Sequence, residues 1–195
     1  MDILLATNNH NKVKEYQEIL TPFNINVLCL KDLKINSDPK ETGHTFKENS
    51  LIKAKALMGE TTLPIIADDS GLIIDAIPDI LGVNSARFMG KDTPYIEKNK
   101  KIIELLKDKD RSASFNCVIT LITSNKDIYQ FEGVCKGTIA FEIEGQNGFG
   151  YDPIFIPNGY DKTFGTFDED EKNKISHRGI ASTKLINFIK AGNKL

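Results

Sequence analysis

The sequence predicts an α/β protein with a mixed β-sheet and flanking helices, and three observations lead to this fold class. Short apolar segments alternate with segments of helical spacing through the first half of the chain. A long alternating segment follows, and a turn joins it to further extended segments, as in a β-meander. Interleaved helices favour parallel strand pairs and a meander favours antiparallel ones, so the sheet is expected to contain both.

The elements expected in the first half follow from apolar spacing and from turn residues. Val13, Tyr16 and Leu20 recur at helical intervals and share one side of a helix. Thr45 is a good N-cap, because Glu48 stands three residues later and completes a capping box. In order, we expect a strand at 3–6, a helix at 12–20, a strand at 25–30, a polar loop at 31–44, a helix at 45–58 and a buried strand at 64–68 that stops at 69–71.

The second half is predicted to be irregular at first and then regular. Residues 78–92 are rich in Pro and Gly, which favours loops, and residues 124–127 have the composition of a hairpin turn. In order, we expect a helix at 95–107, a strand at 112–123, a strand at 128–134 with a continuation of the meander at 136–142, and a closing helix at 176–190.

Composition narrows the functional classes. The 195 residues suit one large domain or two intimate lobes. The chain has 25 Lys and Arg residues and 27 Asp and Glu residues, for a net charge of −2. This balance lacks the excess of positive charge that non-specific DNA binding requires. The three cysteines have no paired spacing, so we expect buried free thiols in a reducing compartment. No signal peptide or membrane-spanning run is apparent, and a cytoplasmic location is expected.

Three cations stand where helices are expected to begin, and this is unusual. His177 and Arg178 open the closing helix, and Lys12 opens the first one. A helix N-terminus carries about half a positive charge, so a cation there is unfavourable unless an anion lies nearby. We therefore predict an anion between these groups.

The first loop is a candidate phosphate-binding turn. It connects a strand to a helix, so backbone N–H groups and short amide side chains surround it, and its lysine can reach a phosphate. It is not a P-loop, because the glycine pattern is missing. The alternative is an ordinary Asn-rich turn. Its residues are Thr7, Asn8, Asn9, His10, Asn11 and Lys12.

Carboxylates suited to a divalent cation or to water activation stand at two places. Asp68 and Asp69 follow a buried strand, and because neighbouring strand residues point to opposite faces, one Asp is expected in the site and the other in the loop. Glu41 precedes the helix that contains Lys53. The alternatives are a self-bonded Asp/Ser/Gly turn, an exposed loop carboxylate and a lysine that extends to water.

A glycine-rich stretch at 147–153 is a candidate base-binding loop. Its glycines permit close backbone approach, Phe149 or Tyr151 could stack on a base, and Asp152 could accept hydrogen bonds from a purine. The alternative is a glycine turn with core aromatics. The acidic run at 168–172 has the character of a solvated helix start, and Lys172 is its one member that could turn inward.

Together these groups describe a site for a metal-bound polyphosphate, and their order resembles the Ham1/RdgB family of purine nucleoside triphosphate pyrophosphatases, the inosine triphosphatases. Six blocks match in order over essentially the full length: 6–12, 41–43 with 45–49 and 53–54, 67–72, 82–83 with 85–87, 148–153, and 171–172 with 175–178. One departure is visible, because the family's first loop usually reads Thr/Ser-Gly-Asn and this chain has Thr7-Asn8-Asn9. Asn tolerates a positive φ better than most residues, so the loop can keep its shape.

The resemblance implies an elongated mixed sheet, two lobes around a nucleotide cleft, and a homodimer. It implies hydrolysis of ITP, dITP and XTP to a monophosphate and pyrophosphate, with ATP and GTP disfavoured and Mg²⁺ as cofactor. Glu41 and Asp69 would hold the metal, and Asp69 would activate water. The first loop and Lys53 would bind the triphosphate. The remaining nucleotide contacts would come from Ser70, Phe149, Gly150, Tyr151, Asp152, Lys172, His177 and Arg178.

Two other functions remain open from the sequence. A hydrolase acting on a different nucleotide could use the same metal and phosphate groups with another base pocket. A nucleotide-binding sensor would keep the phosphate groups and lose the water-activating carboxylate, whereas Asp69 and Glu41 are both present.

Overall fold

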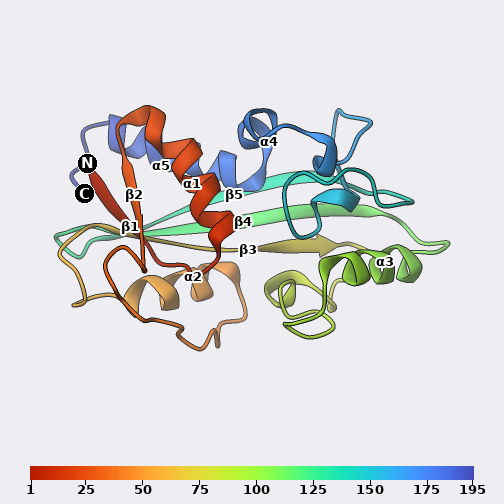
Figure 1. The fold of residues 1–195 in the computed structure, drawn as a ribbon, viewed down its shortest axis with the longest axis horizontal. Helices are drawn as coiled ribbons and strands as arrows, with labels where there is room; N and C mark the ends of the chain where they lie inside the picture. The colour runs from red at the N-terminus through yellow and green to blue at the C-terminus, as the bar shows by residue number, and fades with distance from the viewer. The chain divides into compact units, whose positions relative to one another are not determined.

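The computed structural model describes residues 1–195 and confirms an α/β fold with a mixed six-stranded sheet and five α-helices (Figure 1). The strand order is β2-β1-β3-β4-β5-β6. Strand β1 is parallel to β2 and β3, whereas β5 and β6 are antiparallel. The strands are β1 Asp2–Leu5, β2 Asn26–Cys29, β3 Ile65–Ile74, β4 Ser112–Ile122, β5 Ile128–Ile139 and β6 Phe155–Pro157. The helices are α1 His10–Leu20, α2 Phe46–Lys55, α3 Tyr95–Leu105, α4 Glu169–Ile175 and α5 His177–Lys190. None of these helices combines the length and the apolar character needed to cross a membrane.

The chain divides into two compact units. Unit 1 comprises Met1–Asp69, Cys117–Gly133 and Arg178–Leu195, and unit 2 comprises Ser70–Asn116 and Val134–His177. Each unit has its own buried apolar core.

In unit 1 the two faces of the strands are covered by different helices. Ile3, Leu5 and Ile66 pack with buried side chains of α1 and α5, whereas Leu4 and Ala67 belong to the cluster that contains Ala54 of α2. This division follows from strand geometry, because successive side chains point to opposite faces. Along β3, alternate side chains therefore face α2 on one side and α1 and α5 on the other.

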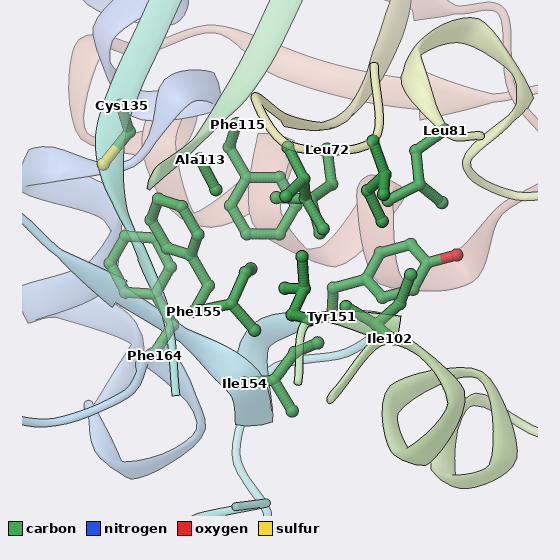
Figure 2. Packing of buried hydrophobic residues seen from close by; sticks show 14 of the residues in the cluster. Leu72, Leu81, Ile102, Ala113, Phe115, Cys135, Tyr151, Ile154, Phe155 and Phe164 are labelled. Atoms are coloured by element: carbon green, nitrogen blue, oxygen red, sulfur yellow. The ribbon is translucent and has the colours of Figure 1, made fainter. Parts of the chain in front are cut away.

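The core of unit 2 is aromatic (Figure 2). The Phe115 and Phe155 rings lie 4.7 Å apart between centroids, and Phe155 and Phe164 lie 5.4 Å apart. Tyr151 belongs to the same buried cluster, although its sequence context also allowed an exposed, base-stacking side chain.

Most predicted elements are confirmed within a few residues, and the capping box of α2 is present, with Thr45 accepting from the Glu48 N–H. The predicted end of the third strand is wrong. Strand β3 continues through Asp69, Ser70 and Gly71 to Ile74. Buried apolar residues resume at Leu72, and cationic side chains from elsewhere in the chain compensate the two carboxylates, so the turn-forming composition does not end the strand.

Three smaller differences also come from tertiary packing. Strand β5 is continuous to Ile139 and does not break into two segments. Helix α4 is a separate element, capped by the Asp168 side chain, and β6 is a short strand that pairs with the end of β5. The three cysteines are free, as expected; the predicted burial is confirmed for Cys117 and Cys135 and is wrong for Cys29, which is partly exposed.

Candidate active site

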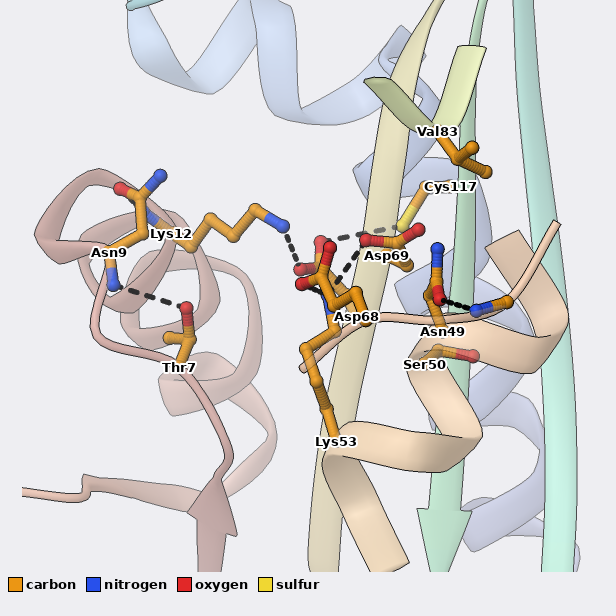
Figure 3. A network of polar contacts seen from close by, with 12 residues as sticks. Thr7, Asn9, Lys12, Asn49, Ser50, Lys53, Asp68, Asp69, Val83 and Cys117 are labelled. Carbon is orange, nitrogen blue, oxygen red and sulfur yellow. Dashed lines mark hydrogen bonds and ion pairs between the residues drawn. The ribbon is translucent and has the colours of Figure 1, made fainter. Parts of the chain in front are cut away.

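Two adjacent carboxylates inside β3 organise the polar groups of unit 1 (Figure 3). Asp68 shares strand parity with Ile66 and lies on the α1 and α5 face, and Asp69 shares parity with Ala67 and lies on the α2 face. Both are buried, with 1% and 6% of their surface exposed. Burial of charge is tolerated only with partners, and each Asp has its own set.

Asp68 is paired with two cations. Lys12 Nζ, from the first turn of α1, contacts Asp68 Oδ1, and Arg178 Nε donates to Asp68 Oδ2 at 2.9 Å. The Cys117 thiol also approaches Oδ2 at 3.6 Å. Burial by itself would raise the pKa of Asp68, but the charges of Lys12 and Arg178 outweigh it and hold the pKa well below its usual range. Asp68 is therefore a permanent anion.

The anion predicted between the helix-starting cations is thus partly supplied by the protein. Arg178 is 1% exposed, and its Nη1 also donates to Glu15 Oε2 at 2.5 Å. Glu15 is a further residue of this site that was not predicted from the sequence. Its signal was its place three residues after Lys12, which puts both on one face of α1.

Asp69 has a different environment. Lys53 Nζ, from α2, lies 2.7 Å from Asp69 Oδ1 and 3.2 Å from Glu41 Oε1. Burial raises the pKa of Asp69 above its usual value, and the Lys53 charge opposes this only in part. The other carboxylate oxygen, Oδ2, is buried and has no hydrogen-bond partner. An unsatisfied carboxylate oxygen is costly, so it marks a place where a ligand or a proton belongs.

These residues fit a magnesium ion. Glu41 and Asp69 offer carboxylate oxygens, which are hard ligands, and both carboxylates contact the Lys53 ammonium group. The second oxygen of Asp69, Oδ2, has no hydrogen-bond partner. The chain contains no cluster of three or more acidic, imidazole or thiol ligands. Two carboxylates are nevertheless a usual protein contribution to Mg²⁺, which takes its other ligands from water and phosphate.

The first loop is an ordered turn. The Asn9 side chain caps α1 by accepting from the N–H groups of Asn11 and Lys12 at 3.0 and 3.3 Å, and Thr7 Oγ1 accepts from Asn9 N–H at 3.1 Å. Asn8 Nδ2 donates to the Ser37 carbonyl at 2.9 Å, which ties the first loop to the loop that leads to Glu41. The side chain that departs from the family pattern thus has a structural partner.

Two further features place this loop. His10 Nε2 lies 3.3 Å from Lys31 Nζ. A hollow of about 80 Å³ lies between the two loops, and its lining includes Thr7, Asn8, Ser37 and Lys53. The hollow brings predicted phosphate-binding residues and Lys53 to one surface of unit 1.

In unit 2 the glycine-rich loop is organised by a buried ion pair. Asp152 Oδ2 accepts from the Phe149 N–H at 2.8 Å and from Lys172 Nζ at 2.7 Å. The Lys172 ammonium also lies 5.0 Å from the centroid of the Phe149 ring. At Gly148, φ is +70° and an added Cβ would lie 2.2 Å from the Asp152 carboxylate, so only glycine fits.

Other predicted base-binding residues are packed into unit 2. The Tyr151 hydroxyl donates to the Ser85 carbonyl at 2.6 Å, and the buried His177 ring stacks on Phe115 with centroids 4.7 Å apart. Ser70 lies in β3 and is partly exposed. A hollow of about 610 Å³ adjoins the loop and is lined by Gln146, Asn147, Gly148, Asp168, Glu169 and Asp170. Its acidic lining does not suit a triphosphate.

Comparison with known proteins finds relatives over nearly the whole chain. A protein named dITP/XTP pyrophosphatase from Dictyoglomus thermophilum is 45% identical over 194 residues, which cover 97% of this chain and 94% of that protein. A Bacillus subtilis protein of the same name is 41% identical and covers 97% and 98%. The solved structure of a HAM1 protein from Coxiella burnetii has a TM-score of 0.87 and 42% identity, covering 98% and 99%. The Ham1 family model matches residues 3–188, and this chain therefore belongs to the Ham1 family.

Proposed function

We propose that this protein hydrolyses non-standard purine nucleoside triphosphates, namely ITP, dITP and XTP, to the monophosphate and pyrophosphate. The names of its relatives support this substrate class. The single structural observation that supports hydrolysis is Asp69, a buried carboxylate with a raised pKa, an unpartnered oxygen and a neighbouring Lys53–Glu41 pair.

Asp69 is assigned as the general base. Its unpartnered Oδ2 accepts the proton of the attacking water, the water oxygen bonds to phosphorus, and the bond that joins the α- and β-phosphates breaks. Glu41 and Asp69 would hold Mg²⁺, which when bound neutralises phosphate charge and polarises water. Lys53 supplies further positive charge at the same place.

Lys12 and Arg178 are assigned different parts. Lys12, whose side chain is 14% exposed, can exchange its contact with Asp68 for a phosphate oxygen. Arg178 is fully enclosed and is held by Asp68 and Glu15, so it orients Asp68 and sets the charge of this region. The first loop and Lys12 are thus the triphosphate-binding groups of unit 1.

The base-binding groups are assigned to unit 2, in the loop that contains Phe149. Asp152 and Lys172 fix the position of the Phe149 backbone and ring, which leaves the ring as the stacking surface for a base. Tyr151, within this loop, is anchored in the core of unit 2, and His177 stacks on Phe115 of the same core. A cytoplasmic location is proposed on the three free cysteines, which suit a reducing compartment.

The proposed reaction is tested with purified protein, Mg²⁺ and a panel of purine and pyrimidine triphosphates. ITP and XTP should yield the monophosphate and intact pyrophosphate. Asp69→Asn should lower kcat by about a hundredfold or more, the usual effect of losing a general base, while nucleotide binding persists. Release of orthophosphate with a diphosphate product would contradict the proposal.

The same panel separates the two alternatives. A hydrolase specific for another nucleotide would turn over that nucleotide in preference to ITP and XTP. A sensor would bind nucleotide without turnover, and its binding would be unchanged in Asp69→Asn.

A further inference from the structure

Helix α3 contains no residue among the groups proposed to bind substrate, yet three of its side chains hold the loop that does. Tyr95, Lys98 and Asn99 lie in its first two turns and share one face. Their contacts reach two segments of unit 2, residues 85–86 and residues 150–151.

Asn99 contacts the loop directly. The residue is 2% exposed, and its Nδ2 donates to the Gly150 carbonyl at 3.2 Å. Gly150 has φ of +68°, a conformation that is unfavourable for most other residues, so its carbonyl direction is set by the turn and by this bond together. The Asn99 Oδ1 atom is buried without a hydrogen-bond partner, and such an unsatisfied acceptor lowers the stability of the folded protein.

Tyr95 contacts the loop at Tyr151, the residue that follows Gly150. Its ring meets the Tyr151 ring edge to face, with centroids 5.2 Å apart and an interplanar angle of 86°. A Cβ added at Gly150 would lie 3.7 Å from the Tyr95 ring, so a methyl group would just fill the space between this residue and the ring. Gly150 and Tyr151 are therefore both held by α3.

Lys98 joins the second segment to this arrangement. Its residue surface is fully buried, its Nζ donates to the Ala86 carbonyl at 2.8 Å, and the same atom lies 4.8 Å from the Tyr95 ring centroid. The Tyr151 hydroxyl donates to the adjacent Ser85 carbonyl. Helix α3 therefore holds both segments in one polar and aromatic assembly.

We propose that Asn99 and Tyr95 are positioning residues that set the conformation of the 149–152 loop and thereby determine base selectivity. This inference rests on the proposed function, because selectivity is defined only for a nucleotide substrate. The Phe149 ring is the proposed stacking surface, and Asp152 fixes the Phe149 N–H. A change in the direction of the Gly150 peptide would move the residues on both sides of it.

The first test replaces Asn99 by leucine, which keeps the shape and removes the donor. The ratio of kcat/KM for ITP to that for ATP should fall about two- to tenfold, the range expected from one hydrogen bond, mainly through a higher KM for ITP. Lys101→Ala is the matched control, because the Lys101 side chain is 41% exposed and pairs with Glu104, and it should leave the ratio unchanged.

The second test uses the aromatic contact. Tyr95→Phe keeps the ring edge against Tyr151 and should retain the ratio, whereas Tyr95→Ala removes the ring and should lower it. The two Tyr95 variants still test the proposal if Asn99→Leu does not fold. A role limited to stability would lower the melting temperature of both alanine and leucine variants and leave the ratio intact, and that result would overturn the proposal.

Amide hydrogen exchange separates this inference from the proposed function. In Asn99→Leu, exchange at the Asp152 N–H, which donates to the Phe149 carbonyl at 3.2 Å, should become faster than in Lys101→Ala. If wild-type protein fails to hydrolyse ITP, the proposed function is wrong, and the exchange result still decides whether α3 sets the loop. Unchanged exchange together with an unchanged ratio would overturn the inference.

Discussion

At the scale of single residues, the protein makes two identical side chains chemically different. Asp68 and Asp69 are consecutive and both buried, but Asp68 meets two cations and Asp69 meets one. The pKa of Asp68 is consequently lowered and the pKa of Asp69 is raised. Opposite shifts in neighbouring acids are the pattern expected when one group is an electrostatic anchor and the other exchanges protons.

Asp68→Asn should destabilise the protein strongly. It leaves Lys12 and Arg178 without their shared anion, and breaking a buried pair in this way costs about 3–5 kcal/mol. The difference should be measured by urea unfolding of both proteins at pH 7 and pH 5. A loss of less than about 1 kcal/mol would contradict the anchoring role.

The lowered pKa of Asp68 also predicts how the difference in unfolding free energy between the two proteins depends on pH. Because the folded-state pKa of Asp68 is lowered, its contribution is present above the unfolded-state pKa of about 3.9 and is lost as the pH falls through the folded-state value. The difference between the two proteins should therefore be the same at pH 7 and pH 5. It should then shrink as the pH falls below the unfolded-state value, and a difference that stayed constant there would show that the pKa is not lowered.

At the scale of elements, α2 positions the two groups that surround Asp69. Its buried Asn49 side chain accepts from the Gly43 N–H at 2.8 Å, which holds the loop two residues after Glu41. Lys53 lies four residues after Asn49, on the same helix face, and reaches Glu41 and Asp69. The position of Glu41 relative to Asp69 thus depends on the contact between Gly43 in the loop and Asn49 in α2.

Gly43→Ala should weaken Mg²⁺ binding more than it weakens folding. An added Cβ would lie 2.6 Å from Glu48 Cβ and 2.7 Å from Asn49 Oδ1, so the loop must move and Glu41 with it. The Mg²⁺ concentration for half-maximal activity should rise several-fold, while the melting temperature falls by only a few degrees. Thr42→Ala, which changes the exposed neighbouring side chain, is the control. Equal metal requirements in all three proteins would refute this account.

At the scale of the whole molecule, the chain passes repeatedly from one unit to the other within regular elements. Strands β3, β4 and β5 each contain such a passage, at Asp69, Cys117 and Gly133 respectively. The proposed phosphate and metal groups belong to unit 1, and the proposed base-binding loop belongs to unit 2. One chain therefore supplies every proposed group.

We expect the protein to be a homodimer, as its family resemblance implies. Several large apolar side chains are exposed in the single chain, among them Phe141 at 82% and Val134 at 43%, and burial of such surface favours association. Light scattering coupled to size exclusion should give about twice the chain mass of 21.8 kDa across a range of protein concentrations. A mass that stays at that of one chain would refute this expectation.

The sequence alone determined much of the molecule. Apolar periodicity located all but the shortest strand and most helices, because burial of one face imposes a local repeat. Residue types indicated a site for a metal-bound polyphosphate, because carboxylates, lysines and glycine turns have limited chemical uses. The family also followed from residue patterns, since six ordered blocks match over nearly the full length.

Tertiary structure alone decided how these residues are used. The Asp-Asp-Ser-Gly segment has the composition of a turn, yet it stays in β3 because Lys12, Lys53 and Arg178 compensate its charges from distant parts of the chain. Local composition cannot encode such partners, which lie up to 110 residues away. The pairing of Arg178 with Glu15, and the support of the 149–152 loop by α3, are decided in the same way, because a side chain's partner depends on packing and not on sequence spacing.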